Sequence, residues 1–387
     1  MPSEAKFEGW LQGVNDILRA DELPADTLRR SVNYVITDTG KIQRRRGSAK
    51  VYNGSIQRDS LYSDPTRTLF VESGHLKELR RDIAGAYSAA LVRLDVGTSP
   101  MAYVNINNSI HYSNGIITGI VGPDCEDWKW GVSSPGTQPN AEAGGSGDLA
   151  AGTYQVAITF INERREESGT GLAVVVAIPE SSDGVGSITL TDFPPAPSDV
   201  QFIRIYISHV NGEGLYRVTD VLPGLPLYRI NQVSNTATFR LETQFGMEPP
   251  PGRLLEYHNG RVYIANGSVL WCTQPLRYGL TKPAMDFFQF PDVIDVLKAV
   301  DSGIYVCSGD KTYYIEGIDT ANLGQDVILP YGGVYDTGIR IPNYDAVAWF
   351  SHRGIVMGGE GGRVTNIMDD RVAVAQYKRG TMFWREH

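Results

Sequence analysis

Short strand–turn–strand units recur along the chain, and this recurrence restricts the possible fold more than any other feature. Each unit has an apolar strand pattern, a turn that contains Gly or Asn, and a second strand pattern. The units are 32–46, 68–81, 102–114, 260–273, 303–317 and 354–368. Helical patterns are nearly absent, and only one short helix is expected, at 24–30. With 42 Gly and 21 Pro among 387 residues, the sequence predicts an all-β fold with many tight turns.

The spacing of these units predicts a β-propeller-like body. A segment of different character, 138–246, separates the third unit from the fourth. When this segment is removed, successive units begin roughly 34–51 residues apart, which overlaps the period of about 40–50 that propeller blades have. We therefore expect an N-terminal arm and the first blades in 1–137, and the remaining blades in 247–387.

The segment 138–246 is expected to form an inserted β-sandwich of the immunoglobulin or fibronectin type III kind. Residues 143–147 are interpreted as a flexible Gly-rich leader. Six strand patterns follow, at 153–162, 172–178, 187–193, 200–210, 215–221 and 236–242. The proline run 249–251 cannot continue a central strand and marks the return to the first domain.

Composition excludes several classes of protein. The longest apolar run, at 172–179, is far shorter than the roughly 18–20 residues that span a bilayer, and the N-terminus has no apolar core of a signal peptide. The three Cys, at 125, 272 and 307, have neither disulfide-framework nor zinc spacing, so we expect a reducing compartment. A net charge of −9 argues against tight nucleic-acid binding by the whole surface.

Motifs for catalysis, metals and cofactors are not found, so we predict a protein that is not an enzyme and has no cofactor. The glycine-dense stretch 358–363 lies between two strands and is interpreted as a hairpin turn, because a phosphate site needs a following helix. The six His show no metal-binding spacing. Four acids near expected blade strands are candidates for a glycosidase carboxylate pair, although solvated turn positions are the preferred interpretation: Asp286, Asp292, Asp295 and Asp301.

Arg44, Arg45 and Arg46 form a basic cluster at the end of an early strand. In a strand, Arg44 and Arg46 share one face and Arg45 takes the other, and adjacent like charges repel unless something neutralises them. Three interpretations are open: a solvated strand end, a subunit contact with some of the 44 acidic residues, and a nucleic-acid patch. We take these three residues as candidates for a subunit interface.

Two stretches of the sequence resemble proteins at the end of bacteriophage tails. The first contains Leu23-Pro24, then Ser31-Val32-Asn33-Tyr34, and then Thr39-Gly40-Lys41-Ile42-Gln43-Arg44-Arg45-Arg46-Gly47. The second runs from Pro251 to Gly267 and is followed by Trp271, Pro275-Leu276-Arg277 and Phe288-Gln289-Phe290-Pro291. Both are similar to segments of the tail nozzle or tail hub β-propellers of short-tailed phages.

This resemblance implies a structural virion protein that is made in the host bacterial cytoplasm. It implies a ring-shaped homo-oligomer, a hexamer, that contacts neighbouring tail or adaptor proteins. It also implies a channel that passes double-stranded DNA without sequence-specific contacts and serves genome retention and ejection. The alternative is a receptor-recognition tail protein that binds or cleaves glycans, which is suggested by the aromatic content and the acids near strands.

Overall fold

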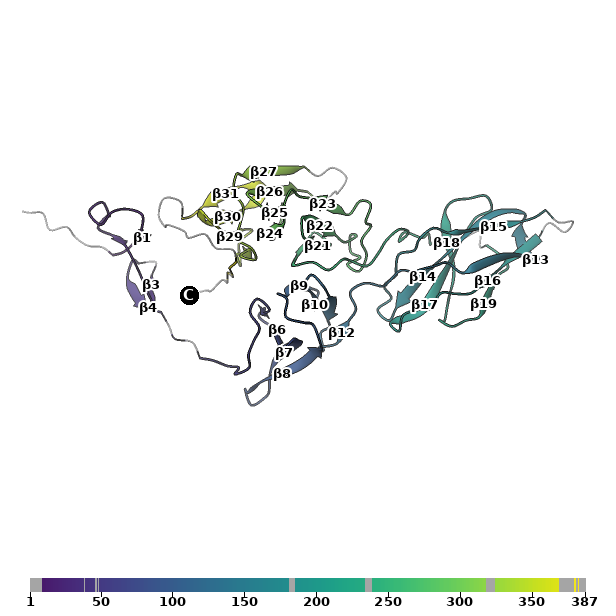
Figure 1. The fold of residues 1–387 in the computed structure, drawn as a ribbon, viewed down its shortest axis with the longest axis horizontal. Helices are drawn as coiled ribbons and strands as arrows, with labels where there is room; N and C mark the ends of the chain where they lie inside the picture. The colour runs from purple at the N-terminus through teal and green to yellow at the C-terminus, as the bar shows by residue number, and fades with distance from the viewer. Residues whose placement is uncertain are drawn as a thin grey trace, which may run out of the picture. The chain divides into compact units, whose positions relative to one another are not determined.

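The fold is all-β (Figure 1). The computed structural model describes residues 9–37, 39–45, 47, 49–180, 185–233, 239–317, 324–368, 379–380 and 382. Within these ranges the secondary structure consists of short strands and one 3-10 turn, Glu360–Gly362. This turn lies between two strands, so the prediction of a hairpin turn at 358–363 is confirmed. The same part of the chain contains no helix that could cross a membrane.

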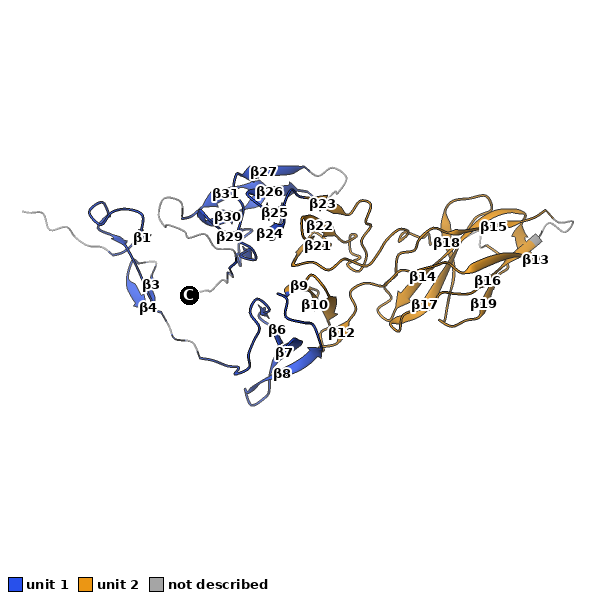
Figure 2. Cartoon of the chain, in the orientation of Figure 1, with its two compact units in different colours: residues 1–101, 290–387 blue, residues 102–289 orange. Residues whose placement is uncertain are grey.

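The chain divides into two compact units (Figure 2). Unit 1 comprises residues 1–101 and 290–387, and unit 2 comprises residues 102–289. The sequence-based boundaries at 137 and 246 stay a prediction.

Five of the sheets in the described residues are four-stranded antiparallel meanders, in which each strand pairs with the next one along the chain. This is the architecture of a propeller blade, and the body is β-propeller-like. Unit 1 holds β5–β8 (Tyr62–Ser63, Thr68–Glu72, His75–Arg81, Tyr87–Arg93), β24–β27 (Ile294–Val300, Gly303–Ser308, Lys311–Glu316, Gln325–Leu329) and β28–β31 (Ile339–Arg340, Val347–Ser351, Gly354–Gly358, Val364–Asn366). Unit 2 holds β9–β12 (Ala102–Ile106, Ser109–Ser113, Thr118–Val121, Asp127–Trp128) and β20–β23 (Leu254–His258, Arg261–Asn266, Val269–Cys272, Phe287–Gln289).

Neighbouring meanders share apolar cores within each unit. In unit 1, Tyr305 and Cys307 of β25 pack with Val347 and Trp349 of β29. In unit 2, Ile106 of β9 and Ile120 of β11 pack in one cluster with strands β20 and β21. Burial of these side chains stabilises the unit by about 1.5–3 kcal/mol for each large apolar residue.

A C-terminal segment fastens two parts of unit 1. Arg379 forms a parallel β-bridge with Tyr335, and its guanidinium lies over the Tyr335 ring, 5.2 Å from the centroid. The same guanidinium is 3.3 Å from the carboxylate of Asp59, which precedes the β5–β8 meander. We call this set of contacts, made by Arg379, Tyr335 and Asp59, the latch.

Seven strands of unit 2 form a two-sheet sandwich. One sheet has the order β13-β16-β19 and the other has the order β15-β14-β17-β18. Side chains from both sheets, such as Ile188, Ile205 and Ile230, meet in a single buried cluster. The strands are β13 Asn140–Ala150, β14 Gly152–Asn162, β15 Val174–Ile178, β16 Val185–Thr191, β17 Val200–Ser208, β18 Leu215–Val221 and β19 Leu227–Ile230. The immunoglobulin or fibronectin type III kind of topology stays a prediction.

The structure corrects two local expectations. The segment 24–30 is not a helix, because the backbone of Thr27–Leu28 (β2) pairs with Gly13–Val14 (β1) in parallel. Residues 143–147 are not a flexible leader, because they lie within β13, where Ala143 and Gly144 pair with β16 and a bulge follows. A Cβ at Gly147 would lie 2.4 Å from the carbonyl oxygen of Gly186, so the glycine permits a close strand approach there.

The two segments that connect the sandwich to the meanders of unit 2 lie next to each other. The Trp130 indole donates a hydrogen bond to the Tyr278 carbonyl at 2.7 Å, just before the sandwich begins. The Ser134 hydroxyl lies 3.1 Å from the Gly246 carbonyl oxygen, which joins the entering segment to the leaving one. The two connections are therefore held side by side by hydrogen bonds.

Candidate functional site

The N-terminal arm, residues 9–45, is built from two small strand pairs. β1 pairs with β2, and β3 (Tyr34–Ile36) pairs with β4 (Ile42–Arg44) as an antiparallel hairpin. No other strand joins the hairpin in the described residues. The first of the six repeated units is therefore a separate hairpin and not part of a four-stranded blade.

One face of this hairpin is apolar and exposed. Tyr34 opposes Arg44 and Ile36 opposes Ile42, so these four side chains share a face. Tyr34 is 55% exposed and Ile42 is 42% exposed. Two-stranded hairpins are marginally stable alone in water, so the exposed apolar face of this one is a candidate contact surface.

The arm also carries unpaired positive charge. Between Thr27 and Lys50 the sequence has seven basic residues and one acidic residue, Asp38. The described basic side chains between Thr27 and Arg45 are exposed, and none lies within 4 Å of a carboxylate of the described residues: Arg29, Arg30, Lys41, Arg44 and Arg45. Among the residues predicted for a subunit interface, Arg44 and Arg45 thus lie together on the arm, whereas Arg46 lies outside the described residues.

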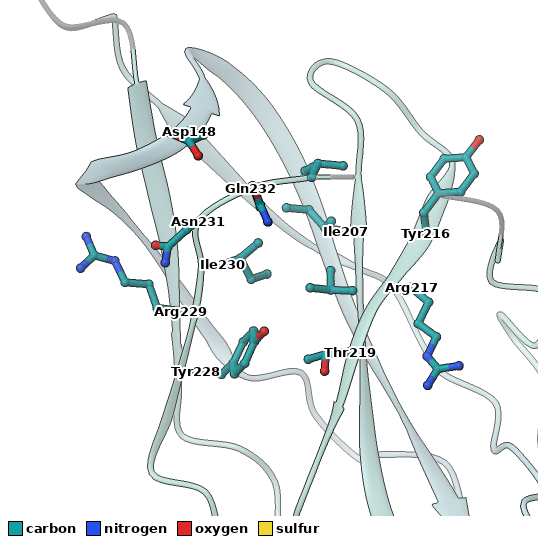
Figure 3. Close-up of a pocket in the computed structure, with 12 residues that line it drawn as sticks. Asp148, Ile207, Tyr216, Arg217, Thr219, Tyr228, Arg229, Ile230, Asn231 and Gln232 are labelled. Atoms are coloured by element: carbon teal, nitrogen blue, oxygen red, sulfur yellow. The ribbon is translucent and has the colours of Figure 1, made fainter. Parts of the chain in front are cut away.

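The sandwich contains a pocket between its edge strands β18 and β19 (Figure 3). Its volume is about 410 Å³. Its lining includes Ile207 and Ile230, which are 1% and 2% exposed, together with Tyr228, Thr219 and Gln232 (Figure 3). The sequence did not predict this pocket, because it joins residues from four separate parts of the segment.

Two arginines line this pocket, and their guanidinium groups point away from it. The guanidinium of Arg229 is held outside by Ser187 and Ser146, at 2.9 Å from the Ser187 hydroxyl and 2.9 Å from the Ser146 carbonyl. Arg217 also points away from the space in Figure 3, and its guanidinium is 2.7 Å from Asp220. The cavity therefore has no cationic group directed into it among its described lining residues.

The four acids considered for glycoside hydrolysis have different environments. Asp286 is buried in unit 2 and lies 3.6 Å from the Arg261 guanidinium, whereas Asp301 lies in unit 1, 2.8 Å from Arg340. Burial, with a smaller effect from the charge of Asp292, raises the pKa of Asp295 to about 6. Asp286 is thus enclosed with its arginine, whereas Asp301 is 77% exposed beside Arg340.

The histidines and metal-binding groups give no site in the described ranges. His111 packs against Trp130 with ring centroids 5.0 Å apart, and burial lowers the pKa of His111 to about 4. Among the described residues, no group of three or more His, Cys, Asp or Glu is placed to hold a metal.

Comparison with known proteins gives no family. No protein-family model matches the chain, and no curated protein matches its sequence. Three solved structures have some likeness to this chain. Apo AztD from Citrobacter koseri matches with a TM-score of 0.33 and 9% sequence identity, over 81% of this chain and 73% of that chain. PorZ, a surface component of the type IX secretion system of Porphyromonas gingivalis, matches with a TM-score of 0.23 and 10% identity, over 83% of this chain and 39% of that chain. The extracellular domain of BT4673 from B. thetaiotaomicron matches with a TM-score of 0.24 and 10% identity, over 86% of this chain and 56% of that chain. This chain therefore covers less than two thirds of PorZ and of BT4673.

Proposed function

We propose that this protein is a structural component of a bacteriophage tail that assembles with copies of itself into a ring, a hexamer, through its N-terminal arm. The observation that carries the proposal is the arm hairpin, with an exposed apolar face beside unpaired arginines. The sequence resemblance to nozzle and hub propellers includes the same arm, since it contains 39–47.

Charge complementarity favours a second copy as the partner of the arm. Residues 27–50 carry a net charge of +6, whereas the whole chain carries −9, so the rest of each copy is strongly acidic. An arm of this charge is attracted to the acidic surface of a neighbour, and its apolar face then becomes buried in the contact. The same acidic surface suits a channel for DNA, because a basic lining would release counterions and hold the DNA tightly.

The proposed function is tested by finding the protein in particles. Mass spectrometry of purified virions of the phage that encodes it is expected to detect the chain, and electron microscopy of those virions is expected to show it as a ring on the tail. Absence from the virions would overturn the proposal. Retention or ejection of DNA is then measured in particles that lack the protein.

The role of the arm is tested by charge reversal. Virions are assembled with Arg44→Glu/Arg45→Glu, which is expected to reduce incorporation at least tenfold because two attractions become repulsions. Arg363→Glu, at an exposed position remote in sequence, is the matched control and is expected to be incorporated normally. Equal incorporation of both variants would show that the arm is not the assembly element.

A further inference from the structure

The sandwich carries a large share of the negative charge of the chain. Residues 138–246 contain twelve acidic and six basic residues, a net charge of −6. The longer segments that form the meanders, 51–137 and 247–387, together contain 25 acidic and 20 basic residues, a net charge of −5. The arm segment 27–50 carries +6. Since opposite charges steer two surfaces together, the sandwich is the part of a second copy that attracts the arm most strongly.

Most carboxylates of the sandwich are free to take a new partner. Of the eleven in the described residues, four pair with arginines. The other seven have no Lys, Arg or His nitrogen of the described residues within 4 Å: Glu142, Asp148, Glu163, Glu180, Asp192, Asp199 and Glu213. These groups can therefore serve as counter-ions for the unpaired arginines of an arm.

The three-stranded sheet β13-β16-β19 (Figure 1) has an outer face that combines a free carboxylate with an apolar side chain. Glu142 of β13 opposes Thr189 of β16. Thr191, two positions further along β16 and therefore on the same face, opposes Leu227 of β19. Glu142 and Leu227 thus share this face, whereas Leu190 points to the other side and packs in the core.

The end of this face near Leu227 is accessible. Leu227 is 53% exposed, and Glu142 is exposed as well. Asp192 directly follows β16, and its exposed carboxylate accepts a hydrogen bond from the Asn140 side chain at 2.7 Å. The structure describes the chain on both sides of this end, since residues 185–233 are described without a gap.

Arg229 lies on the same face but directs its charge away from Leu227. Its guanidinium is 2.9 Å from the hydroxyl of Ser187, which lies further from Leu227 along the sheet than Arg229 itself. The Leu227 end therefore offers two carboxylates, those of Glu142 and Asp192, beside an exposed apolar side chain. Among the described residues, no cation lies within 4 Å of either carboxylate.

We propose that the arm of one copy docks on this end of the sheet in a second copy. The inference rests on the proposed function, because it takes the arm as the element of assembly. The arm supplies Tyr34, Ile42 and Arg44 on one face. The sheet supplies Leu227 and Glu142 on one face. The apolar contact removes exposed side chains of both copies from water, and the ion pair fixes the orientation of the arm.

Zero-length cross-linking tests which surface the arm reaches and in which copy. Unlabelled and ¹⁵N-labelled full chains are mixed at high concentration and low salt, and a carbodiimide then joins lysine amines to carboxylates that they contact. Lys41, exposed beside Ile42 in the arm, is the reporter. We expect peptides that join Lys41 of one isotopic form to Glu142 or Asp192 of the other. Links only to the meanders, links only within one copy, or no link from Lys41 would overturn the proposal.

Failure of this inference is distinguishable from failure of the proposed function. The cross-links are read in the purified chain, whereas the function is tested by finding the chain in virions. An arm that links to the meanders of a second copy would overturn the sheet as its partner and leave the ring component standing. Absence from virions would overturn the function, and the cross-links would still decide whether the arm docks on the sheet.

Charge exchange locates the contact on the sheet. Glu142→Arg is expected to weaken self-association of the full chain at least fivefold, as measured by analytical ultracentrifugation. Adding Arg44→Glu to this variant is expected to bring association back to within twofold of wild type, because the ion pair forms again with its signs exchanged. Glu213→Arg is the matched control, since Glu213 is an exposed free carboxylate in the turn between β17 and β18, and it should associate like wild type. Equal weakening by Glu213→Arg, or no recovery in the combined variant, would contradict the proposal.

Discussion

Asp286 is a carboxylate that the fold encloses together with its counter-ion. Its side chain is 2% exposed, the side chain of Arg261 is 10% exposed, and Oδ2 of Asp286 also accepts a hydrogen bond from the Lys282 backbone amide at 2.7 Å. Asp286→Ala would leave the Arg261 guanidinium buried without its carboxylate. We expect the free energy of unfolding to fall by about 3 kcal/mol, as measured by urea denaturation.

Asp301→Ala is the matched control for this change. Asp301 also faces an arginine, but its side chain is 77% exposed and water screens the pair. Its loss is expected to cost less than about 1 kcal/mol. Similar losses in the two variants would show that burial does not set the contribution of these ion pairs.

Asp336 links the stability of unit 1 to pH. Burial raises the pKa of this carboxyl from 3.8 to about 6, and the charge of Asp59 adds to the rise, whereas Lys298 and Arg379 oppose it. The folded chain therefore holds a proton at a pH where the unfolded chain has lost it. Stability falls as the pH rises from about 4 to about 6, and above that range the full cost of a buried charge is present.

Asp336→Asn is expected to remove this cost. Its backbone has a φ of 59°, a conformation that Asn also tolerates, so the substitution should not strain the turn. At pH 7.5 we expect the variant to be more stable than wild type by about 1–2 kcal/mol, and this gain should shrink toward pH 4. Thermal unfolding across this pH range is the measurement, and a gain that grows on acidification would have the wrong sign.

At the scale of elements, the short segment 239–241 pairs with the outer edge of β18. The Arg217 amide donates to the Phe239 carbonyl, and the Leu241 amide donates to the Leu215 carbonyl, both at 2.9 Å. Leu241 is buried with Tyr206 and Leu215 on the outer side of this sheet. The segment thus covers an edge that would otherwise be open to pairing with another chain.

Leu241→Ala is expected to lower the free energy of unfolding by about 2–4 kcal/mol, because it empties part of this cluster. Phe239→Ala, two residues away and 68% exposed, is the control and should cost less than about 1 kcal/mol. Urea denaturation of the full chain, followed by tryptophan fluorescence and circular dichroism, measures both. A larger loss in Phe239→Ala would mean that the segment does not pack as described.

Strands that alternate apolar and polar residues and end at a Gly or Asn turn could be predicted from the sequence. Strands that form only because another segment pairs with them could not. The stretch 215–221 is an example of the first kind, since its bounds are those of β18. The strand β13 was missed because its glycines give no apolar alternation, and only pairing with β16 reveals it. Likewise, the pattern at 24–30 gives no sign that β1 would pair with this backbone.

The candidate site was predictable in part for the same reason. The basic cluster at Arg44 and Arg45 is local in the sequence, so composition alone identified it, whereas the exposed apolar face of Tyr34 and Ile42 depends on the register of the hairpin. The pocket brings Asp148 together with Ile207 and Tyr228, and no local pattern connects these residues. The strand β19, which contains Tyr228, was not among the predicted strands.

At the scale of the whole molecule, the chain combines a repetitive body with a module that carries different chemistry. The meanders are built from consecutive strands, so each can form from local contacts before longer-range packing follows. The sandwich has its own core and connects to the meanders of unit 2 through adjacent segments around Ser134 and Gly246. The arm and the sandwich are therefore built from separate parts of the chain, and a substitution in one is expected to spare the fold of the other.

The latch has a consequence for how the protein is made. Asp59 leaves the ribosome early in synthesis and Arg379 late, yet the two are joined in the finished molecule by an ion pair. Until Arg379 has been made, the meander β5–β8 is present without this ion pair, while later sheets form one after another. The latch therefore forms only after Arg379 has been made, and a ribosome that stalls before Arg379 releases a chain that lacks the latch.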